Sequence, residues 1–394
     1  MTTTTALLAH LERLVAFDTQ NPPRAPAGVD ALYAYAEAKL APAGFRVVER
    51  GDLGDGCAWV LFSRGTDERP LVNVHVDTVP ADPGWTENPL ALRVEGGKAT
   101  GLGACDIKGA LAAFLDAAAR TKGSGTLLLT SDEEAGTSRC VRDFLAGREM
   151  TVPVIVSEPT RCRAVTAHRG IGTCAGTFTG LAGHASEARA LDDSAVHEAV
   201  RWAARALEVA RPSPPRRGAG EGPAGAWSGV PGEGPSGAWS GVPGEGPGVR
   251  GVPAGPSGAG DVRLNIGTIE GGVKANMIAS SARVRFGVRP HADPRAVVDA
   301  LCALAPDPAR VTWEPGYFAP PLQETEASHA LVGALGLQRG APVDFFTEAA
   351  LFAAAGAHAI VVGPGDIAQA HTAGEFVEVH ALEHMRAFYE RVLA

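Results

Sequence analysis

Residues 71–77 have the sequence LVNVHVD, an apolar run that ends in a histidine and an aspartate two positions apart. An uninterrupted apolar run of this length predicts a buried strand. Residues two apart along a strand point to the same face, so His75 and Asp77 share one face at its carboxyl end. A histidine beside a carboxylate is a common arrangement at a metal, where the carboxylate orients the imidazole. A single histidine at a strand end is more often structural, so the metal interpretation needs further ligands.

Short apolar strands alternate with helices on both sides of this stretch. Strands are predicted at 57–63, 71–76, 126–130 and 153–156. Helices are predicted at 6–17, 29–42, 108–120 and 137–146. This alternation is typical of an α/β fold, in which helices cover a central sheet. We therefore predict an α/β domain built on a mixed sheet, with the 71–77 strand inside it.

The pattern changes after about residue 172. A strand and turn at 173–186 precede an amphipathic helix at 193–210, and the strands at 262–269 and 281–288 alternate apolar with polar residues. Such strands have one solvated face, which predicts a small α+β domain. The α/β alternation then returns, with elements at 294–303, 309–313, 328–338, 359–362 and from 379. We predict that residues 173–290 form a domain inserted into a domain of residues 1–172 and 291–394.

A Gly/Pro-rich stretch at 212–260 interrupts the inserted domain. Residues 220–231 read GEGPAGAWSGVP and residues 232–243 read GEGPSGAWSGVP, so the stretch contains near-identical repeats. Such a composition offers too little apolar surface to offset the entropy of ordering. We interpret it as a flexible insertion in a surface loop, because loop-closure entropy grows slowly with length. The alternative is a segment that binds a partner through Trp227 and Trp239.

Composition and charge narrow the functional class. The chain has 394 residues, of which 45% are hydrophobic and 20% charged, as in globular proteins. Its net charge of −9 argues against nucleic acid or an anionic membrane as a partner and fits an enzyme of small molecules. There is no apolar run of about 20 residues and no basic N-terminal region, so neither a membrane span nor a signal peptide is expected. The six cysteines form no CxxC pair, which predicts reduced thiols and a cytoplasmic location.

Histidines and carboxylates recur where predicted strands end. Besides His75, they are Glu133 and Glu134, Glu158, His371 and, at the start of a helix, Asp106. The carboxyl ends of strands in such a sheet border one crevice, where we expect these side chains to meet. Histidines and carboxylates together suit zinc, cobalt or manganese. One carboxylate that bridges two ions, with two further ligands on each, leaves room for a shared water.

Each of these residues alone also has an ordinary structural explanation. His75 is compatible with a core residue whose hydrogen bonds are satisfied, and a Glu–Glu pair after a strand is commonly a solvated turn or a helix cap. The coincidence of so many such positions favours the metal site. Within the Glu133–Glu134 pair, one carboxylate can bind a metal while the other takes a proton from a water.

The motifs, in their order, resemble those of the M20 aminoacylase and carboxypeptidase family. They are HVD at 75–77, GLGACDIKGA at 101–110, SDEEAG at 131–136, SEP at 157–159 and GPGDIAQAHTAGEF at 363–376. The resemblance implies a zinc-hydrolase catalytic domain with two divalent ions, zinc or cobalt. It also implies that the inserted domain is a lid through which the chain forms a homodimer.

The resemblance assigns a role to each residue of the site. One metal would be held by His75, Asp106 and Glu158, and the other by Asp106, Glu134 and His371. Glu133 would be the general base and Asp77 the partner of His75. The Asp106–Ile107 peptide would be cis.

Three residues of the inserted domain match family positions that contact substrate. GLAGHAS places His184 where relatives extend a histidine across the dimer to the oxyanion in the partner's site. Asn276 in GGVKANMI and Arg289 in FGVRP match residues that hold the substrate carboxylate, for which an arginine is well suited. Cys105 differs from the residue that the family usually has before the bridging aspartate. Since no histidine or acid is spare to activate it, we interpret it as a packing residue.

Within the family, the segment FFTEAALFAAAG…VVGPGDIAQAHTAGEFV at 345–377 resembles the acetylornithine deacetylases. Together with NPPR at 21–24 and GLGACDIKGA at 101–110, it looks most similar to the N-acetylcitrulline deacetylases. This implies removal of the acetyl group from N-acetyl-L-citrulline in arginine biosynthesis, with Glu348 near the site. N-acetylornithine, succinyl-diaminopimelate and dipeptides are alternative substrates of the same chemistry. A non-catalytic relative would have lost a ligand or the base, and none is missing.

Overall fold

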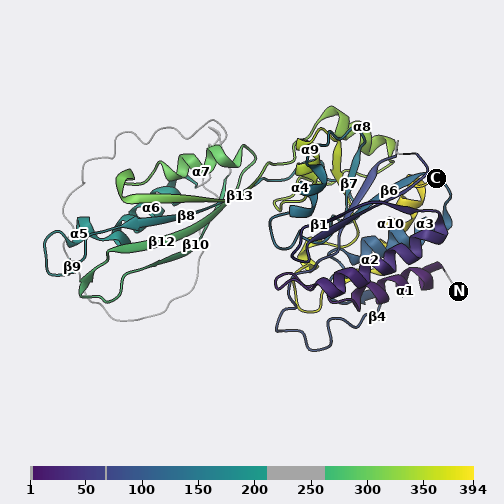
Figure 1. The fold of residues 1–394 in the computed structure, drawn as a ribbon, viewed down its shortest axis with the longest axis horizontal. Helices are drawn as coiled ribbons and strands as arrows, with labels where there is room; N and C mark the ends of the chain where they lie inside the picture. Colours follow the sequence, from purple (N-terminus) through teal and green to yellow (C-terminus); the bar gives the residue numbers. More distant parts are fainter. Residues whose placement is uncertain (1–2, 67–68, 211–261) are drawn as a thin grey trace, which may run out of the picture.

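The computed structural model describes residues 3–66, 69–210 and 262–394, so the Gly/Pro-rich stretch at 212–260 lies outside the described residues. The described chain forms two lobes (Figure 1). The larger lobe combines both ends of the chain, and the smaller lobe is built from its middle. Element labels follow Figure 1.

The larger lobe is built on a six-stranded mixed sheet with the order β1-β2-β6-β3-β7-β14. Its strands are β1 (Arg46–Asp52), β2 (Ala58–Arg64), β3 (Leu71–His75), β6 (Gly125–Thr130), β7 (Val154–Val156) and β14 (Ala359–Val361). β6, β3, β7 and β14 run parallel, whereas β1 and β2 are antiparallel to their neighbours. The predicted mixed α/β fold is therefore confirmed. All five residues of β3 are buried because the strand lies inside the sheet.

Helices cover both faces of this sheet (Figure 1). One face carries α1 (Thr3–Val15), α2 (Pro26–Leu40), α3 (Lys108–Arg120) and α10 (Val379–Val392), and the other carries α4 (Arg139–Leu145) and α9 (Ala349–Ala354). α8 (Glu326–Ala334) contacts β14. α3 is central on its face, where it contacts α1, α2 and α10. A hydrophobic core lies on each face of the sheet, between the strands and these helices. The two cores hold β3 and its neighbours in place, and this fixes where the strands end.

The smaller lobe contains a four-stranded antiparallel sheet with the order β10-β12-β8-β13. Its strands are β8 (Ile171–Thr179), β10 (Arg263–Gly271), β12 (Ser281–Arg289) and β13 (Val311–Ala319). The helices α6 (Ala195–Val209) and α7 (Pro294–Cys302) cover one face. Alternate residues of β8 and β12 are buried, because among the described elements only that face meets helices. Trp202 of α6 forms the centre of this core, with its ring 5.0 Å from Phe286 and 5.3 Å from Trp313.

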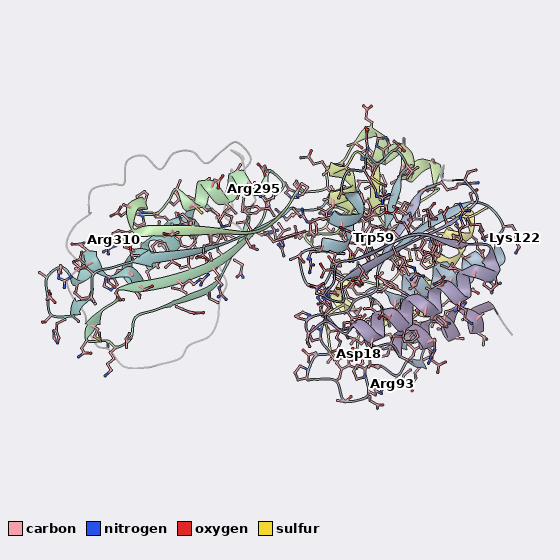
Figure 2. The ribbon with its side chains drawn as sticks, viewed as in Figure 1. Asp18, Trp59, Arg93, Lys122, Arg295 and Arg310 are labelled. Carbon is pink, nitrogen blue, oxygen red and sulfur yellow. The ribbon has the colours of Figure 1, made fainter. Side chains whose placement is uncertain are left out.

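The smaller lobe extends further along the chain than residue 290, the boundary predicted from the sequence. That interpretation placed the elements at 294–303 and 309–313 in the first domain, but α7 packs on β8 and β12, and β13 pairs with β8. Arg310 lies on this lobe in Figure 2, where its guanidinium donates to the Thr179 carbonyl at 3.0 Å. Periodicity identifies a helix or a strand but not the sheet that it joins. We propose that the inserted unit extends to about residue 319.

Short elements complete the two lobes. In the smaller lobe these are β9 (Gly183–His184), β11 (Met277–Ile278) and α5 (Ala190–Asp193). In the larger lobe, β4 (Arg93–Glu95), β5 (Lys98–Thr100) and β15 (Phe376–Glu378) form a three-stranded sheet with the order β15-β5-β4, which the sequence did not predict. β5 leads into the loop that carries Asp106, and β15 follows the loop that carries His371. Pairing of β5 with β15 therefore brings these two loops together.

Candidate metal centre

Parallel strands bring several predicted ligands to the same edge of the six-stranded sheet. His75 is the last residue of β3 and pairs with Thr130, the last residue of β6. Glu133 and Glu134 follow β6 in the chain, and Glu158 follows β7. Strand direction thus places four of the predicted residues at the carboxyl ends of neighbouring strands, where sites form in such sheets.

Asp106 lies between the two histidines. Its Oδ1 is 3.2 Å from Nε2 of His75, and its Oδ2 is 3.3 Å from Nε2 of His371. Nε2 of His75 is also 3.8 Å from Glu158, and Nε2 of His371 is 3.1 Å from Glu134. Two groups of three side chains therefore share Asp106, with one of its oxygens facing each group. The Asp106–Ile107 peptide is cis, as the family resemblance implied.

The cluster has the donors and the charge that divalent cations require. One ligand atom each from His75, Asp106 and Glu134 lie within 4.8 Å of one another. Burial raises the pKa of Glu158 well above its usual value, and the charge of Asp106 raises it further. Burial also raises the pKa of Glu134, although its hydrogen bond with His371 opposes the shift. Buried carboxylates that repel one another are stabilised by cations, and imidazole with carboxylate donors suits zinc, cobalt or manganese.

The neighbouring carboxylates favour a positive charge at both histidines. Hydrogen bonds with Asp106 and Glu134 raise the pKa of His371 to about 11. Burial lowers the pKa of His75, but Asp106 and Asp77 outweigh burial and raise it well above its usual value. Metal-bound imidazole is neutral, so a cation held between these groups would replace the protons. The donor set therefore fits a two-metal centre.

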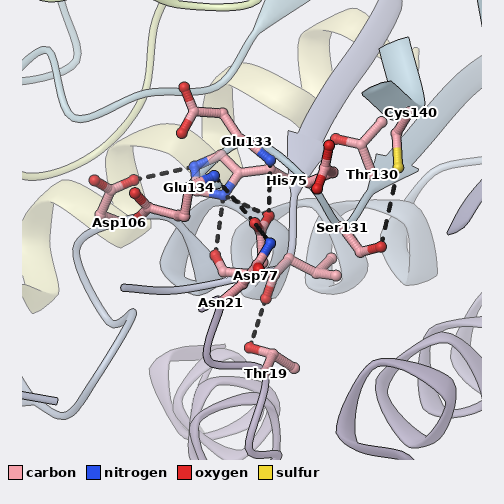
Figure 3. A network of polar contacts seen from close by, with 12 residues as sticks. Thr19, Asn21, His75, Asp77, Asp106, Thr130, Ser131, Glu133, Glu134 and Cys140 are labelled. Carbon is pink, nitrogen blue, oxygen red and sulfur yellow. Dashed lines mark hydrogen bonds and ion pairs between the residues drawn. The ribbon is translucent and has the colours of Figure 1, made fainter. Parts of the chain in front are cut away.

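Asp77 supports two parts of the site. Nδ1 of His75 lies 3.0 Å from the backbone carbonyl of Asp77 and 3.5 Å from its carboxylate, which leaves Nε2 directed at Asp106. The carboxylate also accepts hydrogen bonds from the backbone amides of Glu133, at 3.2 Å, and Glu134, at 3.0 Å (Figure 3). Sequence reasoning predicted only the contact with the imidazole. In the structure, Asp77 also holds the loop that carries the two glutamates.

Glu133 has the electrostatics of a proton acceptor. Burial raises the pKa of Glu133 well above its usual value, and the charges of Glu134 and Glu158 raise it further. A carboxylate with a raised pKa takes and returns protons efficiently near neutral pH. Burial lowers the pKa of Arg289, and the charge of Glu133 opposes that shift. The charges of Arg289 and Glu133 therefore favour each other.

The structure separates the three predicted substrate contacts of the inserted domain. Arg289 ends β12, whereas His184 and Asn276 lie near its opposite end: His184 pairs with Met277, and the Ala185 amide donates to the Asn276 carbonyl at 3.1 Å. At ~3.3 Å per residue, β12 is about 26 Å long. β9 lies at the end of the smaller lobe farthest from the six-stranded sheet (Figure 1). A single chain thus brings Arg289, but not His184 or Asn276, towards its own metal centre.

The model of peptidase family M20/M25/M40 matches residues 71–394. The chain belongs to this family. An N-acetyl-L-citrulline deacetylase from Xanthomonas campestris is 40% identical to this M20 chain over 398 residues, 98% of this chain and 97% of that protein. An acetylornithine deacetylase from Myxococcus xanthus is 30% identical over 412 residues, 99% of this chain and 97% of that protein. A dinuclear metal-binding M20 peptidase from Bacillus subtilis has the same fold, with a TM-score of 0.62 at 13% identity over 99% of this chain and 97% of that one.

Membership makes the chain a metal-dependent hydrolase that acts on amide bonds. None of the helices in the described part of this M20 chain is long and apolar enough to cross a bilayer.

Two further residues that the sequence singled out lie close to the centre of this M20 chain. Cys105 is buried, its thiol donates to the Asp366 carbonyl at 3.5 Å, and burial raises its pKa far above the usual value. A protonated, buried thiol agrees with a packing role. Glu348 is also buried, accepts a hydrogen bond from the Thr130 hydroxyl at 3.3 Å and has a pKa raised to about 7, mainly by burial.

Sequence reasoning missed the support that the NPPR motif gives to the glutamate loop. The Asn21 amide donates to the Asp77 carboxylate at 3.0 Å. The Arg24 guanidinium pairs at 2.6 Å with Asp132, the residue before Glu133. These contacts join parts of the chain far apart in sequence, so no local pattern announces them. The available signal was the motif, because NPPR together with GLGACDIKGA resembles one group of relatives more than the others.

Proposed function

We propose that this M20 hydrolase removes the acetyl group from N-acetyl-L-citrulline, giving citrulline and acetate, as a step of arginine biosynthesis. The observation that carries the proposal is the 40% identity to an N-acetyl-L-citrulline deacetylase over 98% of the chain. The retained cluster of histidines and carboxylates supports catalysis, because a non-catalytic relative would be free to lose a ligand.

The proposed centre holds two ions, zinc or cobalt. His75, Asp106 and Glu158 would hold one, and Asp106, Glu134 and His371 would hold the other. When bound, the ions supply Lewis acidity to a water and to the acyl carbonyl. The division of the Asp106 oxygens between the two histidines supports its role as the bridge.

Glu133 acts as the general base. It takes a proton from the attacking water while the water oxygen bonds to the carbonyl carbon of the acetyl group. It then gives that proton to the amide nitrogen as the carbon–nitrogen bond breaks, so that acetate and the free amino acid leave. The burial of Glu133 supports both transfers, since desolvation makes a carboxylate a better base than an exposed glutamate.

The inserted unit completes the site. Arg289 binds the α-carboxylate of the substrate, and its place at the end of β12 that lies towards the metal centre supports this role. His184 and Asn276 serve the site of a partner subunit in a homodimer, with His184 stabilising the oxyanion. Apolar side chains exposed near β9 and β11 support an interface there: Leu181, Leu191 and Met277. The enzyme is expected in the cytoplasm.

The test is product release by purified protein loaded with zinc or cobalt, with bound metal counted in each sample. Acetate release from N-acetylcitrulline should have a higher kcat/KM than acetate release from N-acetylornithine or succinate release from succinyl-diaminopimelate. Glu133→Gln protein, purified in parallel, controls for contaminating hydrolases. Absence of acetate release from N-acetylcitrulline by protein that holds two ions would exclude the proposal.

N-acetylornithine is the second candidate substrate. The full-length similarity to an acetylornithine deacetylase at 30% identity favours it over other acyl amino acids. A kcat/KM that is higher for N-acetylornithine than for N-acetylcitrulline would transfer the assignment to that substrate.

A further inference from the structure

Glu375 is a buried acid beside the metal centre for which sequence reasoning proposed no role. It lies in the loop between His371 and β15, and only 2% of its surface is exposed. Its Oε1 accepts hydrogen bonds from the backbone amides of Cys105, at 2.8 Å, and Asp106, at 2.9 Å. Its Oε2 accepts from the amide of Gly103 at 3.0 Å. One carboxylate thus binds three amides of the loop that carries Asp106.

The loop needs such an acceptor because of its conformation. Residues 101–107 form turns between β5 and α3, so these amides have no strand partner. Buried amides without an acceptor destabilise a protein, and the two oxygens of a carboxyl group can accept from several amides at once. Gly103 has a φ of +77°, and a Cβ there would come within 2.6 Å of Thr78. The loop is therefore closely packed, and its backbone direction is set by contacts rather than by regular structure.

The same residue also ties the two ligand loops to each other through its backbone. The Glu375 carbonyl accepts from the Gly101 amide at 3.0 Å. This bond and the three side-chain bonds fix the end of the His371 loop against the Asp106 loop. Lys108, at the start of α3, is also buried, and its ammonium donates to the Phe17 carbonyl at 2.9 Å.

We propose that Glu375 is a positioning residue of the metal centre, which sets Asp106 and His371 at the separation that a shared ion requires. The inference rests on the proposed ligand roles of these two residues. Glu375 reaches the centre only through backbone amides, so its contribution is to geometry. It acts on both ions through the bridge and most strongly on the ion held by His371, because that ion takes ligands from both loops.

Glu375→Gln and Glu375→Ala separate this role from a general contribution to folding. Glutamine can keep its oxygen on the Cys105 and Asp106 amides, but its NH₂ group then faces the Gly103 amide, so one of three bonds is lost. Alanine loses all three. Glu378→Gln is the matched control: Glu378 lies three positions on, in β15, and makes no cap hydrogen bond to α10.

The experiment is titration of the metal-free protein with Co²⁺. Calorimetry and the visible absorption of the bound ion monitor the binding. Thermal unfolding of each metal-free variant is measured in parallel. Losing a partner of a ligand typically weakens metal binding 10- to 100-fold, so we expect about tenfold weaker binding of one Co²⁺ in Glu375→Gln and about 100-fold in Glu375→Ala. The Co²⁺ spectrum should change in both, and the Glu378→Gln protein should match the parent.

Wild-type affinity for both Co²⁺ ions in Glu375→Gln would overturn the proposal. So would a variant that unfolds at a lower temperature yet keeps the parent's Co²⁺ affinities and spectrum, because that result shows a purely structural role. If Glu375→Ala does not fold, Glu375→Gln still decides the question. None of these measurements uses a substrate. They therefore test the role of Glu375 even if the proposed deacetylase activity is wrong.

Discussion

The carboxylate of Asp77 accepts a hydrogen bond from the backbone amide of Glu134 at 3.0 Å. A second bond, from the Glu133 amide at 3.2 Å, makes Asp77 the link between β3 and the loop that carries the proposed base. Asp77 also contacts His75, so one aspartate positions two proposed ligands and the base.

Replacement of Asp77 should therefore damage both metal binding and catalysis. In Asp77→Asn, an NH₂ group replaces one carboxylate oxygen and opposes an amide that donates to it. We expect metal affinity to fall about 10- to 100-fold, as for other partners of metal ligands, and kcat to fall even at saturating metal. Metal titration and steady-state kinetics measure the two effects. Asp82→Asn, in an exposed loop, is the control, and an Asp77→Asn protein with full metal affinity and kcat would contradict the role.

Glu133→Ala should lose activity and keep its metal. Glu133 is the proposed base and is not among the proposed ligands, so the expected loss is about 10²- to 10⁴-fold in kcat with two ions still bound. Metal content per chain and the rate of acetate release measure this. Glu149→Ala, at an exposed position, serves as the control. Wild-type rates in Glu133→Ala would assign the base to another residue.

The interior of the larger lobe was predictable because buried elements carry strong local patterns. The sequence predicted a helix at 108–120, and α3 spans Lys108–Arg120. β1 was missed because its residues alternate between exposed and half-buried, and the sequence RVVERGD has no apolar run. The pairing of β13 with β8 was missed because a local pattern does not specify a distant partner.

For the candidate site too, local patterns were predictable from the sequence and distant contacts were not. Ligand types at strand ends were visible in the sequence, because each lies next to an apolar run. Asn21 and Glu375 were not assigned a role, since their hydrogen bonds join residues 56 and about 270 positions apart. What a single sequence lacks is the list of contacts that supports a site, and that list comes from tertiary structure.

His184 tests whether the site needs a second subunit. His184→Ala should retain both ions and lose activity, because the residue lies far from the metal ligands of its own chain. Mixing His184→Ala with Glu133→Ala subunits should then restore activity, since a mixed dimer contains one site with an intact base and an intact histidine. With random exchange of subunits in a C₂ dimer, about a quarter of the wild-type activity is expected.

The measurement is acetate release before and after subunit exchange, with each variant exchanged against itself as the control. Full activity of His184→Ala alone would contradict a catalytic role. Inactive mixtures whose subunits have exchanged, as shown by differently tagged chains, would contradict a site shared between subunits.

Removal of the metals should make stability fall as pH rises. The pKa values of the proposed ligands Glu134 and Glu158 are raised in the folded metal-free protein, mainly by burial, so these groups bind protons more tightly when folded. Their stabilisation is complete below the unfolded glutamate pKa of about 4.3 and is lost as pH rises through the raised values. The contribution of His371 to stability changes with pH in the same direction. It is complete below about pH 6.5 and is lost as pH rises towards the His371 pKa of about 11.

The metal-free protein should therefore have a lower Tm at about pH 8.5 than at about pH 6, and bound metal should remove most of that difference because the ligands bind it deprotonated. Asp106 does not reverse the trend, since its pKa is lowered and its contribution changes only in strong acid. Thermal unfolding with and without a chelator measures this. His371→Asn should flatten the pH dependence of the metal-free protein, whereas His358→Asn, at an exposed position, should not. A Tm of the metal-free protein that rises over this pH range would show that the carboxylates and histidines do not hold protons in place of metal.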